Sequence, residues 1–159
     1  MNSGYEQSKR VDALLWSIAL PGFGQIRNGQ FLKALLFIVL EILINMNAHL
    51  NMLIYFTFQG DITSAIAQTN YQWLLFYPCL YLFAAWDAYS GAGGGQEPFS
   101  YLPFVFGAYS GTIGVIFSST FAVAGMLLGP VWGPILFILL GVISGIFAQK
   151  AILNYYKIK

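Results

Sequence analysis

The sequence predicts an all-α integral membrane protein, in which a bundle of four transmembrane helices follows an N-terminal re-entrant or interfacial helical hairpin. Composition is the first observation behind this prediction: 58% of the 159 residues are hydrophobic and 8% are charged, with a mean hydropathy of +0.68. A soluble domain carries about 25% charged residues, and a soluble chain this apolar would expose large apolar patches. The other two observations are the length of the apolar runs and the positions of the lysines and arginines between them.

Four apolar segments are long enough to cross a bilayer, since a spanning helix needs about 20 mostly apolar residues. We expect these helices at 31–47, 71–89, 101–117 and 131–150. The last of them is expected to continue as a polar tail to Tyr156. Two further apolar segments, 11–20 and 121–129, are too short to span.

The seven lysines and arginines distinguish two topologies. If 11–20 spanned the bilayer, these residues would divide at best five inside and two outside. If 11–20 instead dips in and returns, all seven and both termini lie on the cytoplasmic face, which the positive-inside rule favours. The sequence alone leaves open whether 11–26 spans or re-enters. We expect the protein in the plasma membrane of a bacterium, with both termini cytoplasmic.

The chain divides into three parts on this basis. Residues 1–10 are expected to form a cytoplasmic tail. Residues 11–91 hold the re-entrant segment, the first two spans and a long outer loop at 48–70. In that loop, Gly60 followed by Asp61 indicates the end of one helix and the N-cap of another. Residues 92–159 hold the last two helices and a basic cytoplasmic tail.

The break between the first two apolar segments carries a recognisable motif. It reads PGFGQIRNG, and a Trp-Asp pair, Trp86-Asp87, lies near the end of the 71–89 segment. Over residues 8–91 the chain resembles the TM-two domain family of small membrane proteins, whose bacterial members often read PG-x-GQ-x-Y-x-G. Arg27 replaces the usual tyrosine, and the loop between the two spans is longer than in the family. The resemblance implies two joined spans and no shared catalytic residues. The matching motif residues are Pro21, Gly22, Gly24, Gln25 and Gly29.

Three polar side chains recur along the first expected span. Glu41, Asn45 and His49 are spaced at i, i+4 and i+8, so they share one helix face. Glu41 would lie about 15 Å from the cytoplasmic end of the helix, close to the middle of the bilayer. One hypothesis is a relay for protons or ions along the three side chains. The other, which we favour, is that they are hydrogen-bonding contacts that fix helix packing.

A second polar set is expected at the cytoplasmic face. Arg27 and Lys33 flank the start of the first span, and Asp87 ends the second. We predict that Asp87 pairs with Arg27 or Lys33 and ties the broken segment to the second span. Such a partly buried pair is more often structural than functional.

Glycines at GxxxG spacing mark the second half of the chain, in the pairs Gly107–Gly111 and Gly141–Gly145. Small residues let helix backbones approach closely in lipid. Packing between the last two helices is the favoured interpretation. Contact with a second copy, or with a larger membrane protein, is the alternative.

No pattern in the sequence indicates enzymatic chemistry. The sequence contains no phosphate loop, no nucleotide fingerprint and no metal-ligand cluster, and Cys79 is its one cysteine. We expect no cofactor and no metal, and a net charge of +1 does not indicate a nucleic-acid partner. The sequence therefore predicts a non-enzymatic multi-pass membrane protein, in contact with the lipid bilayer, that acts by helix–helix packing with itself or a membrane partner. The alternative is a small channel or transporter component that uses Glu41, Asn45 and His49.

Overall fold

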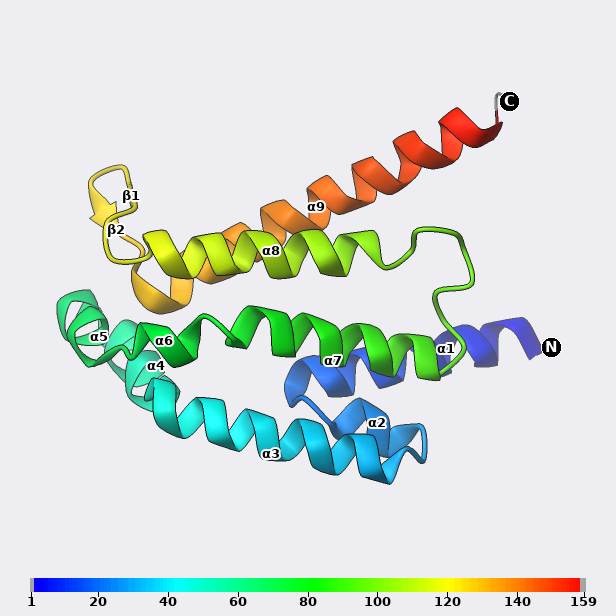
Figure 1. Cartoon of the computed structure of the whole chain (residues 1–159), viewed down its shortest axis with the longest axis horizontal. Helices are drawn as coiled ribbons and strands as arrows, with labels where there is room; N and C mark the ends of the chain where they lie inside the picture. Colours follow the sequence, from blue (N-terminus) through cyan, green and yellow to red (C-terminus); the bar gives the residue numbers. More distant parts are fainter. Residues whose placement is uncertain (1, 158–159) are drawn as a thin grey trace.

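The computed structural model describes residues 2–157, and nearly all of that chain is α-helical. Figure 1 shows three layers: α8 and α9 lie on one side of α7, and α3 lies on the other. Both ends of the described chain lie at one end of the bundle, while α5 and the short β-hairpin lie at the opposite end. We call these the terminal end (residues 27–33 and 87–101) and the distal end (residues 49–70 and 118–130).

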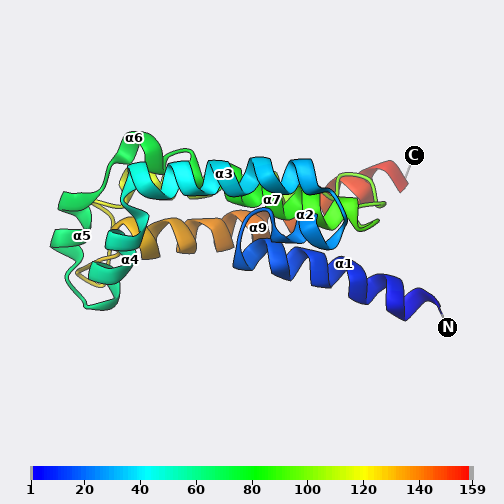
Figure 2. The same ribbon diagram turned by 90° about the horizontal axis from the view of Figure 1, so that it is seen from below.

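The N-terminal hairpin consists of α1 (Asn2–Ala19) and α2 (Phe23–Arg27). The end of α1 reaches the middle of α7, where the Tyr81 hydroxyl donates a hydrogen bond to the carbonyl of Ile18. The chain then turns and returns to the terminal end, where the Asn28 amide donates to the carbonyl of Ala88. The segment 11–20 therefore enters the bundle and turns back part-way along it (Figures 1 and 2). Residues 2–10, expected as a tail, form the first half of α1.

Next in the chain is α3 (Phe31–Ala48), which agrees closely with the expected helix at 31–47. The expected helix at 71–89 is instead two helices, α6 (Tyr71–Leu74) and α7 (Tyr77–Gly91). Pro78, in the first turn of α7, has no backbone N–H to continue the ladder from α6, which explains the break.

At the distal end, α4 (Leu50–Phe58) and α5 (Ile62–Gln68) fold back over the bundle. His49 adopts a left-handed backbone conformation that separates α3 from α4. Asp61 caps α5 and accepts a hydrogen bond of 3.0 Å from the backbone N–H of Ser64, as a residue at an N-cap does. A buried apolar cluster joins α3, α4, α6 and α8 at this end, made of Ile44, Ala48, Leu50, Leu53, Leu74 and Val115.

The second half of the chain is the antiparallel pair α8 (Leu102–Phe117) and α9 (Gly129–Lys157). A small hairpin connects them, in which β1 (Ala122–Val123) pairs with β2 (Met126–Leu127). Ala124 and Gly125 both have positive φ, as the two-residue turns preferred in such hairpins require. This hairpin is a minor exception to the expected all-α fold.

Two of the described helices have the length and composition to cross a bilayer: α3, with a mean hydropathy of 1.9, and α9, with 2.3. α8 is apolar but has 16 residues, and α7 has 15. The segment 71–89 is therefore not a single helix, and four helices of spanning length are not confirmed. The all-α class is confirmed.

Candidate functional site

The motif at residues 21–29 forms a wedge between α1, α3 and α7. Pro21 is fully buried, and Gly22 has a φ of 104°, a left-handed conformation that favours glycine. A Cβ atom on Gly22 would also lie 2.7 Å from a side-chain carbon of Ile38 and 2.8 Å from the carbonyl oxygen of Ala34. Conformation and close approach to α3 therefore both require glycine at this turn.

Gly24 lies where α2 presses against both α1 and α7. A Cβ atom on Gly24 would lie 2.5 Å from Cβ of Ala88 and 2.9 Å from Cβ of Ser17. Gly29 differs, because a Cβ there would meet nothing within 4 Å and its φ is 71°. Close packing thus requires glycine at position 24, whereas the left-handed backbone of the turn before α3 favours glycine at position 29.

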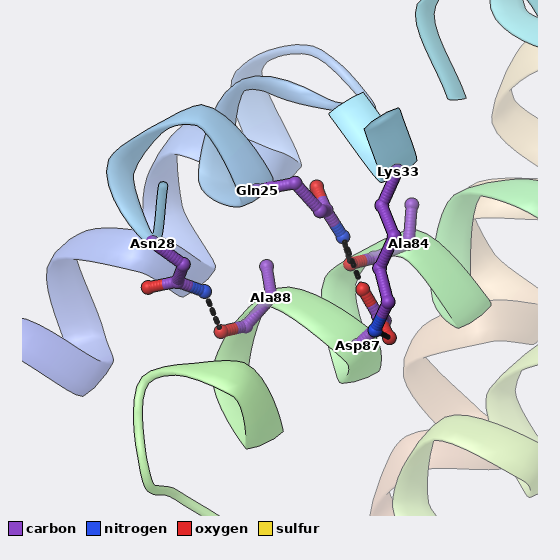
Figure 3. Close-up of polar contacts among 6 residues, drawn as sticks. All are labelled: Gln25, Asn28, Lys33, Ala84, Asp87 and Ala88. Atoms are coloured by element: carbon purple, nitrogen blue, oxygen red, sulfur yellow. Dashed lines mark hydrogen bonds and ion pairs between the residues drawn. The ribbon is translucent and has the colours of Figure 1, made fainter. Parts of the chain in front are cut away.

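Gln25 connects the wedge to α7. Its side chain is fully buried, and Nε2 donates to the carbonyl of Ala84 at 2.9 Å and to Oδ2 of Asp87 at 3.0 Å (Figure 3). Gln25 is one of the residues that match the TM-two motif, but the resemblance implies no role for its side chain. A lone glutamine in a glycine-rich turn gives no sequence signal for such a contact.

Asp87 receives a second partner from the start of α3. Nζ of Lys33 lies 2.7 Å from Oδ1 of Asp87, and the Asp87 side chain is 17% exposed (Figure 3). Each carboxylate oxygen of Asp87 is therefore bound by a different element, Oδ1 by α3 and Oδ2 by α2. The arrangement fixes the spacing between the two helices and α7.

Arg27 does not join this cluster, so of the two cations predicted as partners of Asp87 only Lys33 contacts it. Its guanidinium pairs with Asp12 of α1 at 2.8 Å, with side chains 58% and 38% exposed. The reason is the hairpin itself: because the chain reverses at Pro21 and Gly22, the end of α2 comes to lie beside the middle of α1.

Asn28 makes a contact with α7 that the sequence did not predict. Its Nδ2 donates to the carbonyl of Ala88 at 2.8 Å, close to the Gln25 contact with Ala84 (Figure 3). The Asn28-Gly29 dipeptide is a turn signal in the sequence, but it does not indicate which carbonyl the asparagine binds. Two side-chain amides from the motif thus bind two carbonyls on successive turns of α7.

The neighbouring Trp86 points toward α8 instead. Its ring centroid lies 5.3 Å from that of Phe104 and 6.2 Å from that of Tyr89. A Cβ atom on Gly95 would lie 3.0 Å from Cζ3 and 3.2 Å from Cζ2 of the Trp86 indole ring. The Trp-Asp pair therefore joins α7 to both of its neighbours, α8 through Trp86 and the hairpin through Asp87.

Glu41 and Asn45 of α3 and His49, which follows the end of α3, are not connected to one another by direct hydrogen bonds among the described residues. Glu41 is buried and accepts a hydrogen bond of 3.3 Å from the Tyr77 hydroxyl. Asn45 contacts Asn51 at 3.4 Å, and Nδ1 of His49 lies 2.9 Å from the Gln68 carbonyl oxygen. Within residues 2–157 no hydrogen bond links Glu41, Asn45 and His49 to one another. Each instead contacts a different segment, which fits the packing hypothesis.

The four GxxxG glycines are all used inside the chain. Cβ atoms on Gly107 and Gly111 would meet Val142 and Ile138 of α9 at 2.9 and 2.5 Å. On the other helix, Gly141 and Gly145 lie against Ser110 and Pro103 of α8. The small-residue surfaces of α8 and α9 therefore cover each other.

Among the described residues, no group of three or more His, Cys, Asp and Glu side chains lies close enough to hold a metal ion. Cys79 is exposed on α7, and its Sγ lies 3.7 Å from the Thr112 hydroxyl. The chain matches no family model, no curated protein and no solved structure. The best-defined polar site is thus the set Gln25, Asn28, Lys33, Ala84, Asp87 and Ala88, which we call the hairpin clamp (Figure 3).

Proposed function

We propose that this chain is a four-span integral membrane protein of the cell membrane with a re-entrant N-terminal hairpin and cytoplasmic termini. The observation that carries the proposal is the outward face of α3, which is apolar between the exposed Lys33 near one end of the helix and the exposed Asn47 near the other. A soluble protein rarely exposes such a surface, whereas lipid covers it at no cost. The exposed residues of this face are Leu32, Leu35, Leu36, Val39, Ile42, Leu43 and Met46.

The distribution of charge supports the orientation. Lys9, Arg10, Arg27, Lys33 and Lys150 all lie toward the terminal end, and the distal end carries Asp61 and no lysine or arginine within the described residues. The positive-inside rule then places the terminal end in the cytoplasm.

The two shorter helices are compatible with four spans. α7 and α8 are about 22 and 24 Å long at 1.5 Å per residue, against a hydrocarbon thickness of about 30 Å. Local thinning of the bilayer costs only a fraction of a kcal/mol per Å of mismatch. α6 and the β-hairpin extend both helices at the distal end.

A non-helical turn inside the membrane is tolerated only where protein or water satisfies the backbone. The turn of the hairpin fulfils this condition, since the Phe23 N–H donates to Leu20 at 3.0 Å and the Ile26 N–H donates to Gly22 at 3.1 Å. We propose that the TM-two-like motif serves this purpose, so that the hairpin clamp holds a re-entrant segment in place.

The function we propose is non-enzymatic: contact in the membrane with a second copy or another membrane protein. Because α8 and α9 cover their own glycines, the contact surface we propose is the outward face of α3. The alternative, a small channel or transporter component, has less support, because Glu41, Asn45 and His49 each bind a separate partner.

Topology can be tested with single cysteines in a Cys79→Ser background. We expect an impermeant maleimide added outside intact cells to label Thr63→Cys and to leave Leu32→Cys and Gln96→Cys unlabelled. Labelling of Leu32→Cys from outside would mean that 11–20 spans. Release of the protein from membranes by alkaline carbonate would overturn the membrane assignment as a whole.

The contact surface can be tested with a photo-crosslinking amino acid. At Leu36, on the outward face of α3, we expect a discrete protein adduct, and at the buried Ala34 we expect none. Only lipid adducts at Leu36, Val39 and Leu43 would overturn the proposed contact.

A further inference from the structure

Glu41 places a carboxyl group in the interior of the bundle, between α3 and α7. The residue is 6% exposed, and Phe37 and Ile44, one turn to either side on the same face of α3, are buried as well. Figures 1 and 2 show α3 and α7 side by side. Across this contact the Tyr77 hydroxyl donates a hydrogen bond of 3.3 Å to Oε1 of Glu41. The carboxyl group is thus enclosed by protein on the inner face of α3.

The second oxygen of this carboxyl group has no partner. Oε2 of Glu41 is buried and makes no hydrogen bond within the described chain. The ring of Tyr81 lies 5.7 Å from that of Tyr77, but the Tyr81 hydroxyl donates to the carbonyl of Ile18. Tyr77 and Tyr81 also contribute the two polar side chains in the lining of an otherwise apolar cavity beside α7. The described surroundings therefore supply one donor to Oε1 and no partner to Oε2.

Within the described chain, no cation balances an ionised Glu41. The sequence has no lysine or arginine between Lys33 and Lys150. Lys33 lies two turns earlier on α3, about 12 Å away along the helix axis, and is paired with Asp87. His49 lies two turns later, and its Nδ1 binds a backbone carbonyl of α5. A negative charge on Glu41 would therefore be buried without a counter-ion.

The other elements that pack against α3 do not change this balance. α2 carries Arg27, which is paired with Asp12. α4 carries Tyr55, which is exposed, and α6 carries Tyr71, whose buried hydroxyl has no hydrogen-bond partner in the described chain. Tyrosine side chains are neutral at neutral pH, so these residues place no unpaired charge beside Glu41.

We propose that Glu41 is a proton-binding site, with the proton on Oε2 and the carbonyl oxygen Oε1 held by Tyr77. In the binding step one proton from water joins the carboxylate to give the acid, and no other group changes. A buried charge with one donor and no cation is far more unfavourable than a neutral acid with one unpartnered hydroxyl. Because a glutamate in water is ionised at neutral pH, folding takes up one proton per chain.

The side chains at the site select a proton over a metal ion. Ca²⁺ takes about 6–8 oxygen ligands, and Mg²⁺ requires an octahedral set. Glu41 and Tyr77 are the side chains that bring oxygen atoms together here. The site goes beyond the contact proposed for the outward face of α3 and does not depend on it, since Glu41 lies on the inner face.

The test is infrared spectroscopy of the full chain purified in dodecyl maltoside, a detergent that has no carbonyl group. At neutral pH we expect the C=O stretching band of one carboxylic acid per chain. The other described Asp and Glu side chains are exposed or ion-paired, so the band identifies Glu41. Glu41→Gln should remove the band, and the matched control Asp61→Asn, which removes an exposed carboxylate, should retain it. Absence of the band from the wild type, or its persistence in Glu41→Gln, would overturn the proposal.

Two tyrosine variants test the geometry while the carboxyl group stays in place. Tyr77→Phe removes the donor to Oε1, so the C=O band should move to a higher wavenumber. Tyr81→Phe, one turn further along α7, removes a hydroxyl that binds Ile18 and should leave the band where it is. An unshifted band in Tyr77→Phe, or an equal shift in both variants, would overturn the arrangement.

A salt series separates a proton from a metal ion. Sodium chloride should leave the band as it is in choline chloride at the same concentration. Loss of the band with sodium but not with choline would mean that a metal ion replaces the proton, against the proposal. Carbonate extraction and cysteine labelling do not involve Glu41. If they give the proposed topology while the band is missing, the proton site fails and the proposed function stands.

Discussion

Nε2 of Gln25 lies 3.0 Å from Oδ2 of Asp87, although 62 residues separate them in the chain. This contact joins the glycine-rich break to the Trp-Asp pair, the two parts of the motif that stand far apart in the sequence. Asp87 also binds Lys33, and Gln25 also binds the carbonyl of Ala84. These contacts give the motif a packing role, because they hold α2 and α3 against α7.

Loss of the Gln25 amide should destabilise the hairpin. Gln25→Ala leaves an oxygen of Asp87 and the carbonyl of Ala84 without their buried donor, so we expect a cost of about 1–3 kcal/mol. The measurement is thermal unfolding in detergent, followed by circular dichroism. Gln96→Ala, at an exposed position in the loop after α7, is the matched control and should unfold like wild type. Equal midpoints for the two variants would contradict a structural role for Gln25.

Gly24 and Gly4 offer a comparison of two glycines near the N-terminus. In Gly24→Ala the new methyl group would overlap Cβ of Ala88, and we expect destabilisation by about 1–3 kcal/mol. In Gly4→Ala the methyl group meets nothing within 4 Å in α1, so higher helix propensity should stabilise that helix by up to about 1 kcal/mol. Unfolding midpoints that shift in the same direction would refute this assignment of Gly24.

The two ion pairs should differ in strength. Asp87→Asn removes a charge that is 17% exposed and bound by two elements, and we expect a loss of about 1–3 kcal/mol. Arg27→Gln breaks an exposed pair with Asp12 and should cost at most about 1 kcal/mol. Raising the salt concentration should reduce the Arg27 effect more, because exposed pairs are screened. A greater loss of stability in Arg27→Gln than in Asp87→Asn would contradict the view that the Asp87–Lys33 pair is the stronger of the two.

Acid should loosen α5 through its N-cap. Hydrogen bonds from the side chain and the backbone N–H of Ser64 lower the pKa of Asp61. The stabilisation by this cap is fully present above the ordinary aspartate pKa of about 3.9 and is lost as the pH falls through the lower folded value. Amide hydrogen exchange in α5, corrected for its intrinsic pH dependence, should therefore accelerate at low pH. Asp61→Asn keeps the acceptor without the charge, so α5 in this variant should exchange independently of that titration.

Much of the helical framework could be predicted from the sequence. The boundaries of α3 and α8, and the cap at Asp61, follow from apolar runs and from local glycine, proline and aspartate signals. The break before α7 was missed because Pro78 lies within an apolar run that continues through it. An apolar run specifies burial or lipid contact, and it does not specify an unbroken backbone.

The clamp was only partly predictable, for a different reason. Opposite charge and position indicated that Asp87 would find a cation, and Lys33 is the one it contacts. The pairing of Arg27 with Asp12 depends on the tight reversal at Gly22 and not on charge alone. Gln25 and Asn28 bind backbone carbonyls, which every residue carries, so no residue type in the sequence indicates their partners.

The hairpin clamp also sets an order of events during synthesis. Gln25 is made 59 residues before Ala84, the residue whose carbonyl it binds. At about 5–20 residues per second, the ribosome delivers that partner about 3–12 seconds later. Until then the α1–α2 hairpin has neither Asp87 nor the carbonyls of α7 to hold it. The N-terminal segment is thus the first part of the protein to be made, but it can reach its final position only after α7 has been made.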